Sequence, residues 1–131
     1  MDKLEIQKYF DETEGTGILA TSDSQGVVDG AIYARPQVLE DGTVAFIMAD
    51  KLSHENLQSN PRAAYIFHSD ERGYKGLRLY LTKLDETDDE ETIRNVPKRC
   101  SRDHSRRTDA KRHLVRFSVD KVRALVGDQE Y

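Results

Sequence analysis

The stretch from Gly42 to Phe67 reads GTVAFIMADKLSHENLQSNPRAAYIF, which predicts a strand, a short polar helix and a second strand. The first strand, residues 44–49, is apolar on both of its alternating faces, so we expect it to be buried on both sides. Ser53 is the expected N-cap of the helix, and Asn60-Pro61 is expected to end it. A helix of about two turns is too short to be stable alone. We therefore expect an anion at its N-terminus, where free N–H groups and the helix dipole favour negative charge.

The whole chain has the composition of a soluble globular protein, with 37% hydrophobic and 34% charged residues among 131. This length predicts a single domain spanning residues 1–131. No apolar run approaches the roughly 20 residues of a membrane span, so we expect no membrane partner. The N-terminus lacks the basic start and apolar run of a signal peptide, which favours a cytoplasmic location. The single cysteine, Cys100, excludes a disulfide within one chain.

Charge is unevenly distributed along the sequence. An acidic run at residues 85–91 is followed by a basic segment, Lys98–Arg112, without interleaved aromatic residues. With a net charge of -4, this pattern favours a solvated surface over a nucleic-acid partner. His68, His104 and His113 show no spacing typical of metal ligands, so we predict no metal site.

The order of predicted elements indicates a mainly β protein with appended helices. Helices are expected over Asp2–Asp11 and, after a Thr87–Glu90 capping box, over Asp88–Val96. Six strands are expected at Gly17–Ser22, Val27–Leu39, 44–49, 63–67, Tyr74–Thr82 and His113–Val119, with a continuation to Val126 left open. Pro36 cannot donate a ladder hydrogen bond and marks an edge or a bulge. The tight turns between strands favour an antiparallel barrel whose edges close on each other or on a partner chain.

Four segments together resemble the pyridoxamine 5'-phosphate oxidase-like superfamily of flavin-binding split barrels. They are Ala34-Arg35-Pro36, the Asp41-Gly42 hairpin, Met48-Ala49-Asp50, and the run from Asn56 to Arg62, which reads NLQSNPR. The last of these is the most specific, and the resemblance extends over nearly the whole chain. It implies a homodimer of six-stranded antiparallel split β-barrels, with FMN bound where the two subunits meet.

The same resemblance implies which residues contact FMN. Tyr33, Ala34, Arg35 and Pro36 would line the flavin ring, and the backbone of Met48, Ala49 and Asp50 would meet the ring or ribityl chain. Lys51, Ser53, His54 and Asn56 would surround the phosphate, while Lys75 and Arg78 would reach the partner subunit's site. Two departures stand out: Leu52 and Ser53 occupy positions that are basic in many relatives, and the chain lacks the closing Arg-x-His segment of true pyridoxamine phosphate oxidases. Pyridoxamine phosphate oxidase activity is therefore not expected.

The resulting hypothesis is an FMN-dependent oxidoreductase acting on a small molecule, with the chemistry supplied by the cofactor and no catalytic side chain assigned. One alternative is a non-enzymatic flavin-binding or stress-related protein on the same scaffold. A second is a split barrel that has lost FMN and binds another ligand, such as haem or a deazaflavin. Two residue roles stay open: Arg35 fits a flavin contact or an edge-strand surface charge, and His54 fits a phosphate contact or a solvated side chain.

Overall fold

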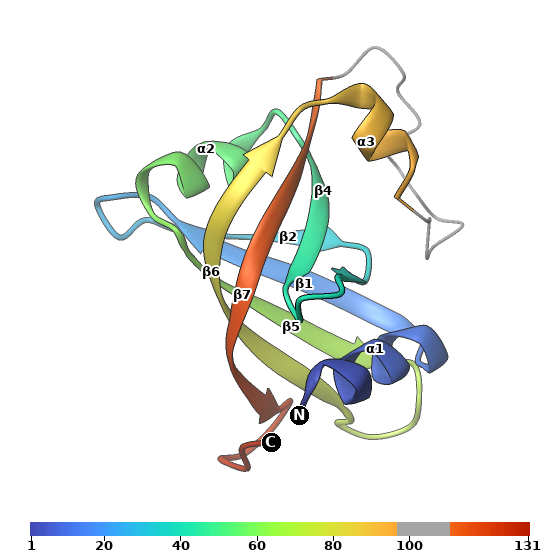
Figure 1. The fold of residues 1–131 in the computed structure, drawn as a ribbon. Helices are drawn as coiled ribbons and strands as arrows, with labels where there is room; N and C mark the ends of the chain where they lie inside the picture. Colours follow the sequence, from blue (N-terminus) through green and yellow to red (C-terminus); the bar gives the residue numbers. More distant parts are fainter. Residues whose placement is uncertain (97–110) are drawn as a thin grey trace.

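The computed structural model describes residues 1–96 and 111–131 and shows a strongly curled antiparallel sheet with three helices around it (Figure 1). The elements are α1 (Lys3–Glu12), β1 (Gly15–Ser22), β2 (Val28–Tyr33), β3 (Gln37–Val38), β4 (Val44–Ala49), α2 (Leu52–Ser59), β5 (Arg62–Ser69), β6 (Gly76–Thr87), α3 (Glu90–Arg94) and β7 (Arg112–Ala124). The strand order is β2-β1-β5-β6-β7-β4-β3. Most of the basic segment, with Cys100 and His104, lies outside the described residues.

Among the described residues the sheet has seven strands where six were predicted, because the expected strand Val27–Leu39 is broken. The break falls at residues 34–36, between β2 and β3. β2 pairs with β1 at one edge of the sheet, and β3 pairs with β4 at the opposite edge. Pro36 lacks the N–H that a continuous ladder needs, and it is fully buried at this crossing. Pro36 was predicted to mark an edge or a bulge of one strand, but it lies outside any strand, where the chain crosses from one edge of the sheet to the other.

Aromatic side chains from α1, β4, β5 and β7 fill the inside of the curl. Phe10, Tyr65, Phe67 and Phe117 are completely buried, and Phe10 meets the edge of Phe67 with ring centroids 5.3 Å apart. The predicted alternation of β6 is confirmed: Leu77, Leu79 and Leu81 are buried, and the residues between them are partly exposed. The two-sided burial expected for β4 holds for Val44, Ala45 and Phe46, whereas Ile47 and Ala49 are half-buried.

Several element boundaries differ from those predicted. β6 continues to Thr87 because its second half pairs with β7, so Thr87 is a strand residue and not a helix cap. The N-cap of α3 is Asp89, whose carboxylate accepts a hydrogen bond from the Thr92 N–H. α1 begins as expected, with a capping box formed by Asp2 and Glu5.

The two longer helices lie at different ends of the sheet (Figure 1). α2 contacts β1, β2 and β4, so it spans the gap between strands that belong to opposite edges. Among the described residues, no helix is long and apolar enough to cross a membrane.

Candidate functional site

The turn between β4 and α2 builds the most distinctive polar site of the described chain. β4 ends at Ala49, Asp50 and Lys51 form the turn, and α2 begins at Leu52. The N-cap residue is Lys51, which makes no side-chain cap hydrogen bond. The prediction of Ser53 as N-cap is wrong, because the helix begins before it and its side chain is buried. The N–H groups of the first turn of α2 therefore have no side-chain acceptor from the cap position.

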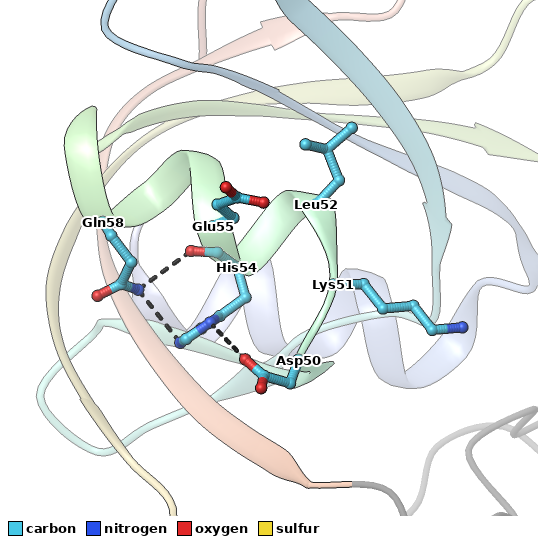
Figure 2. A pocket seen from close by; sticks show the side chains of 6 residues that line it. All are labelled: Asp50, Lys51, Leu52, His54, Glu55 and Gln58. Atoms are coloured by element: carbon cyan, nitrogen blue, oxygen red, sulfur yellow. Dashed lines mark hydrogen bonds and ion pairs between the residues drawn. The ribbon is translucent and has the colours of Figure 1, made fainter.

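An open depression of about 440 Å³ lies over this helix start (Figure 2). Its lining residues are Asp50, Lys51, Leu52, His54, Glu55 and Gln58. Figure 2 shows Asp50, His54 and Gln58 linked along one side of α2, whereas Leu52 points away from them. The depression thus has a polar wall, organised by contacts among Asp50, His54 and Gln58, and one apolar lining residue, Leu52.

Two histidines form the centre of the polar wall. His54 of α2 stacks on His113 of β7, with ring centroids 3.7 Å apart and an angle of 7° between the planes. Asp50 lies beside one edge of the pair, with Oδ1 3.3 Å from His54 Nδ1 and 3.5 Å from His113 Nε2. Glu86 of β6 lies beside the other edge, with Oε2 2.6 Å from His54 Nε2 and 3.3 Å from His113 Nδ1. The ring pair is therefore held between two carboxylates.

Glu86 is fixed as an ionised acceptor. Burial acts to raise the pKa of Glu86, but hydrogen bonds from Lys83, Gln58 and His54 outweigh it and lower the pKa to about 2. Gln58 Nε2 donates to Glu86 Oε1 over 2.8 Å, and Lys83 contacts the same oxygen. A carboxylate without a proton can only accept hydrogen bonds, so the ring nitrogens that face Glu86 carry the hydrogens.

Sequence spacing could not have predicted this cluster. His113 lies on the strand that pairs with β4, and His54 lies on the helix that follows β4, so only the folded sheet brings them together. The single local signal was the i, i+4 spacing of Asp50 and His54. The ring of His54 contacts the carboxylates of Asp50 and Glu86 and is only 11% exposed, while its predicted contact with a phosphate stays a prediction.

The side chains expected around a phosphate are divided between the surface and the interior. Lys51 and His54 line the depression. Ser53 is buried and hydrogen-bonds the hydroxyl of Tyr33, whose pKa is raised chiefly by burial. Asn56 is also buried, and its Nδ2 donates to Thr21 Oγ1 over 3.0 Å. Ser53 and Asn56 thus attach α2 to the sheet.

The segment expected to line a flavin ring lies at the crossing between β2 and β3. Arg35 donates from one guanidinium nitrogen to the carbonyl oxygens of Phe10 and Thr13, over 2.8 and 2.7 Å. These acceptors are at the C-terminal end of α1, where the helix dipole favours a cation. Pro36 is buried, Met48 belongs to the core and Ala49 is half-buried.

The structure does not bring Lys75 and Arg78 to the depression of the same chain. Lys75 pairs with Glu71 over 3.5 Å on the surface. Arg78 donates to the carbonyl oxygens of Ala124 and Gly127, which fastens the segment after β7 to β6. Both residues belong to the β5–β6 side of the sheet, away from the helix start.

Comparison with known proteins identifies the fold through structure alone. No protein-family model matches the chain, and no curated protein matches its sequence. An FMN-binding protein from Syntrophomonas wolfei is 18% identical, with a TM-score of 0.74 over 97% of this chain and 90% of that one. HupZ from Group A Streptococcus is 16% identical, with a TM-score of 0.72 over 100% and 99% of the two chains.

A third similar structure is a provisionally assigned pyridoxamine 5'-phosphate oxidase from Lactobacillus delbrueckii. It is 15% identical, with a TM-score of 0.65 over 90% of this chain and 89% of that one. These likenesses agree with the resemblance carried by the sequence motifs. The protein therefore has the mainly β split-barrel fold of the pyridoxamine 5'-phosphate oxidase-like proteins.

Proposed function

We propose that residues 1–131 form a single FMN-binding unit that acts as a flavin-dependent oxidoreductase on a small molecule. The observation that carries this proposal is the start of α2, which has no side-chain cap, has Lys51 beside it and opens into a depression. Backbone N–H groups at a helix N-terminus and an adjacent ammonium are the usual partners of a phosphate. The likeness in fold to an FMN-binding protein supports a flavin phosphate as the anion.

The residues at this helix start fit an anion only in part. Lys51 is exposed, and the first-turn N–H groups of α2 are available. The nearby carboxylate of Asp50 is turned toward the two histidines, as Figure 2 shows for His54. The buried Ser53 and Asn56 cannot offer their side chains without leaving their present partners. In this proposal the phosphate is held by backbone groups and Lys51, not by a basic pair.

The second part of the proposal is a homodimer with the flavin between the subunits. The outer face of β1 and β2 exposes Ile18, Val28 and Ile32, of which Val28 is 77% and Ile32 is 66% exposed. Ile18 pairs directly with Ile32 on one side and with Ile66 on the other, so these residues form one continuous apolar strip. Such a strip favours a protein interface. A partner seated there would bring its own Lys75 and Arg78 toward the neighbouring site.

Bound FMN would supply the transfer of a hydride or an electron pair to or from the substrate. The chain's own residues would orient the ring and set the charge around it. Tyr33, Ala34, Arg35 and Pro36 would form the wall beside the ring, and the backbone of Met48, Ala49 and Asp50 would lie along its edge. A cation close to the ring would favour the reduced anionic flavin, and Lys75 from the partner is our candidate for it.

Flavin titration tests the cofactor. Purified protein is mixed with FMN, and binding is followed by flavin fluorescence and by absorbance near ~450 nm. We expect Lys51→Ala to weaken FMN binding by about tenfold, because one charge-assisted contact to the phosphate is lost. Lys8→Ala, which removes an exposed lysine of α1, is the matched control and should bind as the unaltered protein does.

Two further results distinguish the alternatives. A protein that binds FMN but is neither reduced by a nicotinamide donor nor reoxidised by an acceptor is a flavin carrier or stress-related protein, not an oxidoreductase. A colourless protein that takes up no FMN contradicts the proposal. Titration with haem and with a deazaflavin would then identify the ligand of this scaffold.

A further inference from the structure

Three potential metal ligands lie close together at the polar wall of the depression. They are Nδ1 of His54, Nε2 of His113 and a carboxylate oxygen of Asp50, and all lie within 4.8 Å of one another. His113 is 7% exposed, and its Nε2 has no hydrogen-bond partner among the described residues. A buried ring nitrogen without a partner is costly, so its environment requires an explanation.

The positions of the hydrogens on the two rings determine which nitrogens have free lone pairs. Glu86 Oε2 lies 2.6 Å from His54 Nε2 and 3.3 Å from His113 Nδ1, so both nitrogens are placed to donate to this carboxylate. In neutral imidazoles this leaves the opposite nitrogens, His54 Nδ1 and His113 Nε2, as bare lone pairs. Both lone pairs face the Asp50 carboxylate, itself an acceptor. Three acceptor atoms this close together repel each other unless a cation lies among them.

We propose that this point binds a divalent first-row transition-metal ion, with His54, His113 and Asp50 as its three protein ligands. Tetrahedral zinc has ligand bonds of about 2.0–2.2 Å, which places neighbouring ligands about 3.4 Å apart. The separations of Asp50 Oδ1 from His54 Nδ1 and His113 Nε2 are 3.3 and 3.5 Å, so two edges of such a tetrahedron are already present. The ligand positions therefore need little movement.

Binding requires one specific rearrangement. The two rings are nearly parallel, at 7°, so their lone pairs run side by side and do not converge. Rotation of the His54 ring out of the stack would direct its lone pair at an ion bound by His113 Nε2. His54 is on the first turn of α2 and Asp50 is 58% exposed, so the outer two ligands can adjust while the buried His113 stays in place.

The surroundings favour zinc-like ions over magnesium or calcium. Imidazole suits zinc, copper, iron and nickel, whereas magnesium and calcium prefer oxygen ligands. Glu86 supplies the outer contact that metal-bound histidines usually have, a carboxylate on the second ring nitrogen. Since Asp50 and His54 line the open depression, the remaining coordination position faces solvent and can hold water or a ligand atom. Two histidines, one carboxylate and an open position are typical of reactive metal centres.

Metal uptake by the chain without an affinity tag tests the site, and it does not depend on flavin binding. The protein is stripped with a chelator and titrated with Zn²⁺ by calorimetry, and separately with Co²⁺ by visible absorbance. We expect about one Zn²⁺ per chain and, with Co²⁺, intense visible bands of a four-coordinate ion. No uptake of either ion would overturn the proposal.

Variants assign the ligands. Asp50→Asn removes an exposed ligand without disturbing the core, so it should keep the native circular dichroism and bind Zn²⁺ at least about tenfold more weakly. His54→Gln should lose the cobalt bands, and Glu86→Gln should weaken Zn²⁺ binding by about 10- to 100-fold. Glu55→Gln changes a neighbouring acid on the same helix and is the control that should bind normally. Equal Zn²⁺ affinity of Asp50→Asn and the unaltered chain would contradict the assignment.

Discussion

Gly17 of β1 lies directly beneath the hydroxyl of Tyr65, so close that a β-carbon at position 17 would be 1.9 Å from the tyrosine oxygen. That oxygen donates a hydrogen bond to the carbonyl of Tyr33, over 3.1 Å. Tyr65 is completely buried, so its ring has no space into which it could retreat. The absence of a side chain on β1 thus lets a tyrosine of β5 reach across to the last residue of β2.

We predict that Gly17→Ala destabilises the protein by about 2–3 kcal/mol, because the added methyl must displace a buried ring and its hydrogen bond. Urea unfolding followed by circular dichroism measures the change. Gly30→Ala is the control, since a β-carbon there would meet only Ile18 Cγ2 at 3.4 Å. An equal loss in both variants would mean that the Tyr65 contact does not determine the cost.

Arg35 is predicted to stabilise the end of α1. Arg35→Ala removes two hydrogen bonds to the carbonyls of Phe10 and Thr13, and the loss should be about 2–3 kcal/mol in unfolding free energy. Arg62→Ala, which removes an exposed arginine at the start of β5, should change stability by less than about 0.5 kcal/mol. Should Arg35→Ala lower FMN affinity while leaving stability unchanged, the flavin contact and not the helix contact would be the main role of Arg35.

The surface ion pair between Arg116 and Asp85 predicts a pH dependence. The hydrogen bond from Arg116 lowers the pKa of Asp85 below its ordinary value of 3.8. A carboxyl whose native pKa is depressed stabilises the fold above its unfolded pKa, and this contribution is lost as the pH falls through the native pKa. The difference in melting temperature between the unaltered chain and Arg116→Gln should therefore be constant near neutral pH and shrink below pH of about 4.

Carboxyl titration by NMR checks the cause. In Arg116→Gln the pKa of Asp85 should return toward its ordinary value. Asp41 also contacts Arg116, but hydrogen bonds from Thr43 are the first cause of its lowered pKa, so the pKa of Asp41 should change less. Equal shifts of the two carboxyls would contradict this division.

The proposed dimer predicts a change in assembly when its apolar strip is charged. Ile32→Lys places an ammonium at the β2 end of the strip and should convert the dimer to monomers in sedimentation velocity. Leu4→Lys, at a 71% exposed leucine of α1, is the control and should leave the dimer intact. Sedimentation of the unaltered chain as a monomer at micromolar concentration would contradict the homodimer directly.

Local patterns in the sequence predicted most of the elements but not the points where distant segments meet. The alternating leucines of β6 and the periodic apolar residues of α1 each predict one buried face, and both predictions are confirmed. Ser53 was predicted as the N-cap because capping preference depends only on the local sequence. In the fold, the tertiary contact of Ser53 with Tyr33 outweighs that preference.

The site shows the same limit more strongly. The resemblance grouped Lys51, Ser53, His54 and Asn56 around a phosphate, whereas in the structure only Lys51 and His54 line the depression. The sequence did not predict that His113 contacts His54. That contact depends on the pairing of β4 with β7, which residue spacing along the chain does not indicate. The break at residues 34–36 was marked by Pro36, but a proline alone does not say that the chain crosses to the opposite edge.

The place of β7 in the strand order has a consequence for biosynthesis. It is the last strand along the described chain, yet it lies between β6 and β4 in the sheet. While the chain is emerging from the ribosome, β4 has only the two residues of β3 as a neighbour among the described strands. The backbone N–H and C=O groups along its other edge are then unpaired. The hairpins formed by β1 with β2 and by β5 with β6 can close early, whereas β4 must wait for a segment more than sixty positions away. Aggregation of nascent or truncated chains should therefore begin at β4, and an added peptide copying β7 should suppress it.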